Sequence, residues 1–191
     1  GLDSEAHHLG LRFQDRTGYE NRGYRVAQAE LTGCYGQPRV DVKLLRERHE
    51  GLIALSACLA GAIAQDLLQE DYDAARSYAL ELKDIFGEDN FYLELQDHGI
   101  PEQRAVNQGI MRLSRELNLP LVVTNDAHYV RREDSVIQDV LLCIQTGKTV
   151  DDTTRMKFKK DEYDLKSEQE MLKLCPNTPA PVEHRRKMCS S

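Results

Sequence analysis

Short apolar runs alternate along the chain with longer segments in which apolar residues recur every three or four positions. The runs at 52–58, 90–99 and 119–128 are short and nearly continuous, which is typical of buried parallel strands. The segments at 71–89 and 101–118 carry their apolar side chains at helical spacing. Strands and helices in this regular order predict βα units, and therefore an α/β fold with a mostly parallel sheet or barrel.

Residues with special backbone preferences mark where the predicted helices begin and end. A helix is expected between Asp41, a suitable N-cap, and Gly51, a suitable stop. Gly87 is expected to end the first of the two helices above, and Pro101 begins the second, where proline is favoured. A further helix is predicted over 132–147.

The two ends of the chain follow this pattern poorly. A helix is indicated over 19–36, yet Arg22, Gly23 and Arg25 interrupt any apolar face that it could have. The last residues, 176–191, contain three prolines and few side chains that a core could bury. The sequence therefore gives neither end a defined place in the fold.

The composition is that of a globular protein. The chain has 191 residues, of which 40% are hydrophobic and 30% charged, enough for one domain with a core. No apolar run approaches the roughly 20 residues that cross a bilayer, and no secretory signal is visible. We therefore expect a cytoplasmic protein without a membrane partner.

Charge and cysteine content narrow the function further. The net charge of -7 argues against a dedicated nucleic-acid-binding module, although bound cations could supply a positive field at an acidic site. No C-x-x-C pair occurs, which argues against a disulfide framework and against a structural zinc knuckle. The five cysteines are Cys34, Cys58, Cys143, Cys175 and Cys189.

Side chains that bind metals or move protons follow each of the three predicted strands. The carboxyl ends of parallel strands in βα folds meet at one face, where sites are built. A thiolate, carboxylates and imidazoles that meet there would suit zinc, or manganese and iron where oxygen ligands dominate. The predicted strands end in Cys58 for the first, in Asp97 and His98 for the second, and in Asp126 and His128 for the third. Asp126 and His128 are two residues apart, so their side chains would share one side of a continuing strand.

Each of these residues also has a structural interpretation. A buried cysteine such as Cys58 is usually a small hydrophobic residue. Asp97 could form an ordinary Asx-turn and cap the helix at Pro101. The pair Asp126 and His128 could belong to a capped turn. The occurrence of all three groups at one predicted face favours metal chemistry over three separate coincidences.

Four long strings of the sequence resemble one known family. They are "QPRVDVKLLRERHEGLIALSACLAG", "IFGEDNFYLELQDHGIPEQRAVNQG", "LPLVVTNDAHYVRRED" and "DVLLCIQTGKTVDD". They closely resemble the polymerase-and-histidinol-phosphatase (PHP) domain of bacterial DNA polymerase III alpha subunits, nearly without gaps from about residue 35 to about residue 174. The resemblance implies a distorted, TIM-like βα barrel whose strand ends hold a cluster of metal ions.

The resemblance also implies roles for individual residues. Asp126 and His128 would close the metal site, and Cys58 would be its cysteine ligand. The string "HHLGLRFQDRTGY" places a further ligand at His8. The positions that would only line the site are His7, Asp97 and His98.

The chain departs from the family at both ends. Residues 1–174 resemble the later part of a PHP domain, with 1–34 divergent, and 175–191 form a tail where the family continues into the polymerase palm. The earlier metal ligands and the polymerase carboxylates have no counterpart in the chain. The resemblance therefore implies a fragment with an incomplete barrel, whose open sheet edges favour self-association.

The function that the resemblance implies belongs to the parent protein. That protein would be a DNA-directed DNA polymerase of DNA replication, with DNA and other replisome subunits as partners. Its PHP module would be a metal-dependent 3′–5′ exonuclease that uses zinc, or else manganese, while magnesium would serve the polymerase site. The fragment itself is expected to be inactive. The alternatives are a non-catalytic scaffold in the replisome and a stand-alone PHP phosphoesterase.

Overall fold

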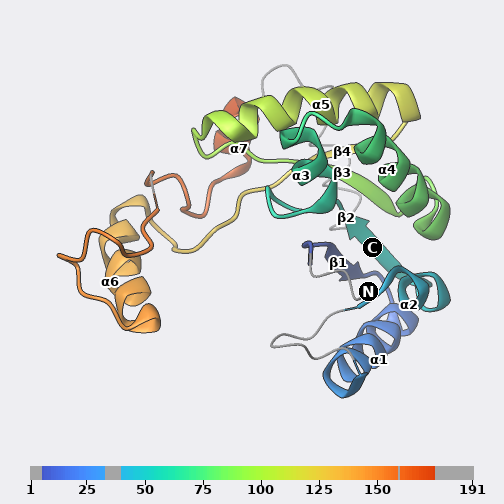
Figure 1. Ribbon diagram of the computed structural model, residues 1–191, viewed down its shortest axis with the longest axis horizontal. Helices are drawn as coiled ribbons and strands as arrows, with labels where there is room; N and C mark the ends of the chain where they lie inside the picture. Colours follow the sequence, from blue (N-terminus) through green and yellow to red (C-terminus); the bar gives the residue numbers. More distant parts are fainter. Residues whose placement is uncertain (1–5, 33–39, 159, 175–191) are drawn as a thin grey trace.

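The computed structural model describes residues 6–32, 40–158 and 160–174. Four strands form one sheet in the order β1-β2-β3-β4, which is also their order along the chain (Figure 1). They are β1 (Gly10–Phe13), β2 (Leu52–Leu55), β3 (Phe91–Leu95) and β4 (Leu121–Val123). Cys34, Cys175 and Cys189, and with them the predicted tail over 175–191, lie outside the described residues.

The sheet is parallel except at one edge. Strands β2, β3 and β4 run parallel to one another, as the sequence predicts. Strand β1 was not predicted, and it pairs with β2 in the antiparallel direction, with Gly10 opposite Leu55 and Phe13 opposite Leu52. The fold is therefore mixed α/β, with one open row of four strands in the described part of the chain.

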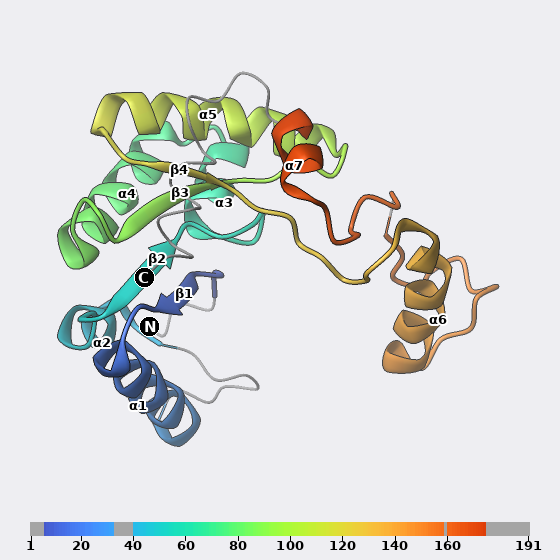
Figure 2. The same ribbon diagram turned by 180° about the vertical axis from the view of Figure 1, so that it is seen from behind.

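The helices between the parallel strands cover one side of the sheet. They are α3 (Ala62–Leu68), α4 (Tyr72–Phe86) and α5 (Pro101–Leu117), and they lie together in both views (Figures 1 and 2). Their buried side chains form one core with those of the strands. Its fully buried members include Leu82 of α4, Leu93 of β3 and Leu113 of α5. Helix α3 was not predicted from the sequence.

The predicted helix boundaries are largely confirmed by the caps. Asp71 caps α4 by accepting a hydrogen bond from the Ala74 amide at 2.9 Å, and the helix ends at Gly87, whose φ is 84°. Pro101 occupies the first turn of α5. A positive φ is easily adopted only by glycine, which explains the stop at Gly87.

The short helix α2 (Val42–Glu47) begins as predicted but ends early. Asp41 caps it through a 2.8 Å hydrogen bond from the Leu44 amide. Gly51 lies beyond the helix and turns the chain into β2 with a φ of 69°. A Cβ atom at Gly18 would lie only 1.8 Å from the Gly51 carbonyl oxygen, so two glycines are needed where the first helix, α1 (Arg16–Thr32), approaches this turn.

Helix α1 (Arg16–Thr32) forms although its sequence lacks an apolar face. The side that it turns toward the rest of the molecule carries Asn21, Arg25 and Ala29, which are spaced four residues apart and all buried. Arg25 is only 2% exposed. The helix therefore lacks a continuous apolar face, as the sequence indicates, and it packs against the molecule with a buried arginine.

The chain beyond β4 extends away from the sheet. A 3-10 turn, η1 (Arg132–Asp134), leads into α6 (Ser135–Thr146), and the chain then returns to α7 (Glu168–Leu174) beside α5 (Figures 1 and 2). Helix α6 exposes much of its apolar surface, at Val136, Ile137, Val140, Leu141 and Ile144. Among the described helices, none is long and apolar enough to span a membrane.

Candidate metal centre

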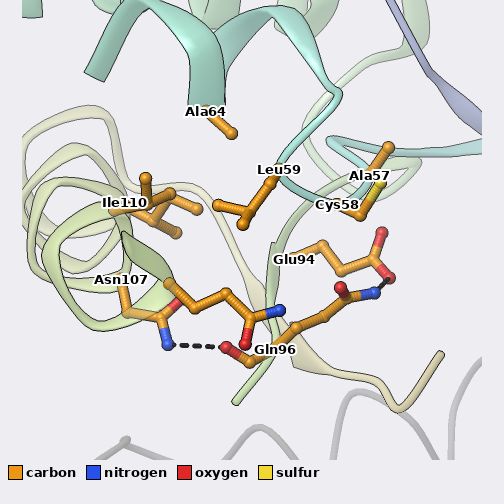
Figure 3. Close-up of a pocket in the computed structure, with 10 residues that line it drawn as sticks. Ala57, Cys58, Leu59, Ala64, Glu94, Gln96, Asn107 and Ile110 are labelled. Atoms are coloured by element: carbon orange, nitrogen blue, oxygen red, sulfur yellow. Dashed lines mark hydrogen bonds between the residues drawn. The ribbon is translucent and has the colours of Figure 1, made fainter. Parts of the chain in front are cut away.

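The carboxyl ends of the parallel strands carry the polar side chains of the sheet. Cys58 follows β2, Glu94 lies near the end of β3, and Thr124 follows β4 directly. Cys58, Glu94 and Gln96 line one pocket, which Leu59 and Ile110 close with apolar atoms (Figure 3). Polar side chains therefore gather at the carboxyl ends of the parallel strands, as predicted. They include residues that the sequence analysis did not select.

His8 and Cys58 are brought together although they are 50 residues apart in sequence. The His8 amide donates a 2.9 Å hydrogen bond to the Ala60 carbonyl, and His8 forms a parallel bridge with Gly61. This places His8 Nδ1 3.7 Å from Cys58 Sγ. The neighbouring His7 is exposed.

Asp126 and His128 form the second pair. Asp126 Oδ2 lies 3.3 Å from His128 Nε2, and the two side chains are 50% and 35% exposed. Strand β4 ends at Val123, so the two residues belong to the following loop and not to a continuing strand. The His128 amide donates a 2.8 Å hydrogen bond to the Tyr163 carbonyl, and Phe158 lies 4.9 Å from the His128 ring.

The spacing within each pair suits two ligands of one metal ion. In a tetrahedral zinc site, bond lengths of about 2.0–2.3 Å separate a nitrogen and a sulfur ligand by about 3.6 Å, and a nitrogen and an oxygen ligand by about 3.4 Å. The observed separations are 3.7 Å for His8 with Cys58 and 3.3 Å for Asp126 with His128. Imidazole, thiolate and carboxylate are also the donor types that zinc prefers.

The two pairs remain separate in this arrangement. No group of three or more His, Cys, Asp or Glu side chains within residues 6–32, 40–158 and 160–174 is placed to hold an ion. Each pair by itself therefore offers two ligands, and a complete coordination shell would need further donors.

A buried polar network occupies the strand ends near both pairs. The Thr124 hydroxyl donates a short hydrogen bond to the Glu94 carboxylate, and Gln96 Nε2 donates to the same carboxylate at 3.3 Å. Ser56 Oγ accepts from the Glu94 amide at 2.8 Å. Sequence reasoning missed this network, although Glu94 is a polar residue in the otherwise apolar strand β3 and Gln96, two positions later, follows its end.

Asp97 has a structural role that the sequence allowed for. Its Oδ1 accepts a 2.8 Å hydrogen bond from the Gly99 amide, which is the predicted Asx-turn. The expected capping of α5 is not found, because the N-cap residue is Ile100 and no side chain caps the helix. Asp97 also lies 3.8 Å from the Arg104 guanidinium.

His98 is buried beside the Asp126–His128 pair. It is 1% exposed, and its ring stacks on that of Tyr163 with centroids 4.3 Å apart. Burial lowers the pKa of His98 below its ordinary value, although Asp126 opposes this shift. The shift favours the neutral form of the imidazole.

Comparison with known proteins identifies the family. Residues 2–98 match the PHP domain. The chain belongs to the PHP domain family. Of the site residues predicted from the sequence, those within the matched region are His7, His8, Cys58, Asp97 and His98, while Asp126 and His128 lie beyond it.

The relatives of this PHP domain chain are DNA polymerase III alpha subunits. The chain is 45% identical over 188 residues to the subunit of Treponema pallidum, which covers 95% of this chain and 16% of that protein. It is 45% identical over 176 residues to the subunit of Thermus aquaticus, which covers 92% of this chain and 14% of that protein. The subunit of Borreliella burgdorferi is 40% identical over 183 residues. The chain thus spans about one sixth of the length of these relatives.

Proposed function

We propose that this chain is part of a DNA polymerase III alpha subunit and that its PHP domain supports metal-dependent hydrolysis of phosphodiester bonds. The observation that carries the proposal is the presence of two donor pairs at metal-ligand spacing near the carboxyl ends of the parallel strands. The similarity to alpha subunits over more than nine tenths of the chain supports the first part. DNA and other replisome subunits are then the partners, and the cytoplasm is the compartment.

The proposed ligands are His8, Cys58, Asp126 and His128. Zinc is the favoured ion because the set contains a thiolate and two imidazoles, and manganese is the alternative. A bound divalent ion lowers the pKa of water and withdraws charge from a phosphoryl oxygen. Asp126 and His128 are 50% and 35% exposed, so a phosphodiester could reach this pair from solvent.

The four strands would then be one arc of a larger βα barrel. Strand β4 and the antiparallel strand β1 are the two edges of the described sheet, where further strands could pair. Such strands would also bring the additional ligands that each pair lacks. Magnesium would serve the polymerase site of the whole subunit.

Zinc titration of the purified chain tests the site directly. We expect the double substitution Cys58→Ser with His128→Ala to lower zinc affinity by at least about tenfold, because it removes one donor from each pair. His49→Ala is the matched control, because His49 precedes β2 and lies at the opposite end of that strand from Cys58. Equal zinc affinity in all three proteins would contradict the proposed ligands.

An assay of hydrolysis separates the enzymatic alternatives. With zinc or manganese present, the proposal expects release of 3′-terminal nucleotides from single-stranded DNA by the complete subunit, and loss of that release in the Asp126→Asn variant. Faster hydrolysis of a simple phosphate monoester than of DNA would instead favour a stand-alone phosphoesterase.

A scaffold role is the second candidate, and the exposed surface of α6 favours it. The side chains of Val136, Ile137 and Ile144 are 71%, 59% and 72% exposed. Contiguous apolar side chains on a surface helix are typical of an interface with another polypeptide. If chelation leaves the thermal stability of the complete subunit unchanged and no nucleotide is released, the scaffold role is the better explanation.

A further inference from the structure

His98 lies at the centre of the contacts that shape the loop with Asp126 and His128. It follows β3 and is 1% exposed. Its ring stacks on Tyr163 with an interplanar angle of 7°, and the Tyr163 ring stacks in turn on Phe158 at 4.4 Å. A fully buried imidazole needs a hydrogen-bond partner at each ring nitrogen, because an unpaired buried polar atom is costly.

The partner of Nδ1 is set by Gln103. The His98 amide donates to Gln103 Oε1 at 2.7 Å, which fixes the amide group with its oxygen toward the backbone. Gln103 Nε2 then faces His98 Nδ1 at 2.8 Å. Since an amide nitrogen can only donate, Nδ1 must be the acceptor and carries no proton.

The proton of the neutral ring therefore resides on Nε2, which faces the loop after β4. Asn125 Nδ2 donates to the Asp164 carbonyl, so the orientation of this amide is also fixed. Among the described residues, Asn125 Oδ1 is a buried oxygen that has no hydrogen-bond partner. His98 Nε2 lies 3.4 Å from the amide nitrogen of Asp126, the residue after Asn125, so this ring nitrogen faces the same part of the loop.

One contact of His98 favours the opposite tautomer, but this contact is long. The Asp126 amide nitrogen lies 3.4 Å from His98 Nε2 and would need a lone pair there. That arrangement would put the proton on Nδ1, directly against the Gln103 donor at 2.8 Å. The shorter contact is the stronger constraint, because hydrogen bonds weaken steeply beyond about 3.2 Å.

His98 also reaches His128 through Tyr163. The Tyr163 carbonyl accepts the His128 amide at 2.8 Å, while the Tyr163 ring packs flat on the His98 ring. His98 thus contacts the loop at Asp126 through Nε2, and it reaches His128 through Tyr163, the residue on which its ring stacks. Gln103 occupies Nδ1 of His98.

We propose that His98 is a positioning residue for the Asp126–His128 pair, as a neutral imidazole that donates from Nε2 to Asn125 Oδ1. In this role it keeps Asp126 Oδ2 and His128 Nε2 at the 3.3 Å separation that suits one ion. The expected effect of His98 on metal binding rests on the proposed function. The tautomer and the hydrogen bond are independent of any metal.

Nitrogen NMR of the metal-free chain at neutral pH tests the first half. We expect His98 Nδ1 to resonate as an unprotonated nitrogen and Nε2 as a protonated one. A proton on Nδ1, or on both nitrogens, would overturn the assignment. This outcome does not depend on whether the chain binds zinc.

Zinc affinity tests the second half. Outer partners of metal ligands commonly change affinity by about ten- to a hundredfold, and we expect a loss of this size in His98→Leu. His98→Gln should recover most of it, because the glutamine amide can donate from near the Nε2 position. Asn125→Ala, which keeps the buried ring but removes the acceptor, should match His98→Leu and guards against a folding failure of that variant.

The outcomes separate the two proposals. If the unaltered chain binds zinc and all three variants bind it equally well, His98 does not position the pair. If the unaltered chain binds no zinc while NMR shows the Nε2 proton, the proposed metal site fails and the hydrogen bond to Asn125 stands.

Discussion

Leu82→Ala is expected to lower the free energy of unfolding by about 3 to 5 kcal/mol. Leu82 is 0% exposed in α4 and belongs to the core that joins the helices to β2 and β3. Truncation removes buried methyl groups and leaves a cavity that the surrounding strands and helices cannot fill without moving. A loss of this size is a large part of the roughly 5 to 15 kcal/mol that stabilises a typical domain.

Urea denaturation measures this effect, and the same helix supplies the control. Leu80 lies two residues away in α4 and is 38% exposed. Leu80→Ala makes the same chemical change in the same helix, so its cost should stay within about 1 kcal/mol. Similar losses in the two variants would show that the packing of α4 described above is wrong.

Arg25→Leu is expected to stabilise the protein by about 1 to 3 kcal/mol. Arg25 is 2% exposed, and its Nη1 and Nη2 atoms have no hydrogen-bond partner among the described residues. Within the described part of the chain, the guanidinium makes one hydrogen bond, from Nε to the Asn21 carbonyl at 3.4 Å, which is long. Burial lowers the pKa of Arg25, since the charged form loses its hydration without gaining an opposite charge.

Removal of this buried charge should therefore raise the free energy of unfolding by more than the loss of the Asn21 hydrogen bond lowers it. Arg22 is exposed in the same helix, so Arg22→Leu makes the same replacement without changing a buried charge. Its effect should lie within about 0.5 kcal/mol of zero. If Arg25→Leu leaves the urea midpoint unchanged or lowers it, the guanidinium has a stabilising partner and is not an unsatisfied buried group.

Much of the candidate site could be anticipated because residues near in sequence stay near in space. Asp126 and His128 were predicted as a pair from their spacing, and they do lie together. Their backbone differs from the prediction, because they lie in a loop and not on a continuing strand. A hydrogen bond from the His128 amide to the Tyr163 carbonyl holds this loop. The 50-residue separation of His8 and Cys58 hides their proximity from spacing alone, and only the resemblance to the family suggested it. The network around Glu94 was missed because its partners come from three different strand ends.

The sequence by itself determined the elements whose signals are local. Asp41, Asp71 and Pro101 begin helices through contacts within a few residues, and Gly87 ends one because of its own backbone freedom. The continuous apolar runs determined the parallel strands, because both faces of such strands are covered.

Only the tertiary structure decided features that depend on distant partners. The alternation of Leu11 and Phe13 with Gly10 and Arg12 is too short to predict a strand by itself, and these residues form one because they pair with the edge of β2. Arg25 is buried because α1 packs there as a whole, against the preference of that one side chain. The sequence predicts only that His98 lines the site, and the positions of Gln103 and Asn125 near its ring, which only the tertiary structure shows, suggest a more specific role.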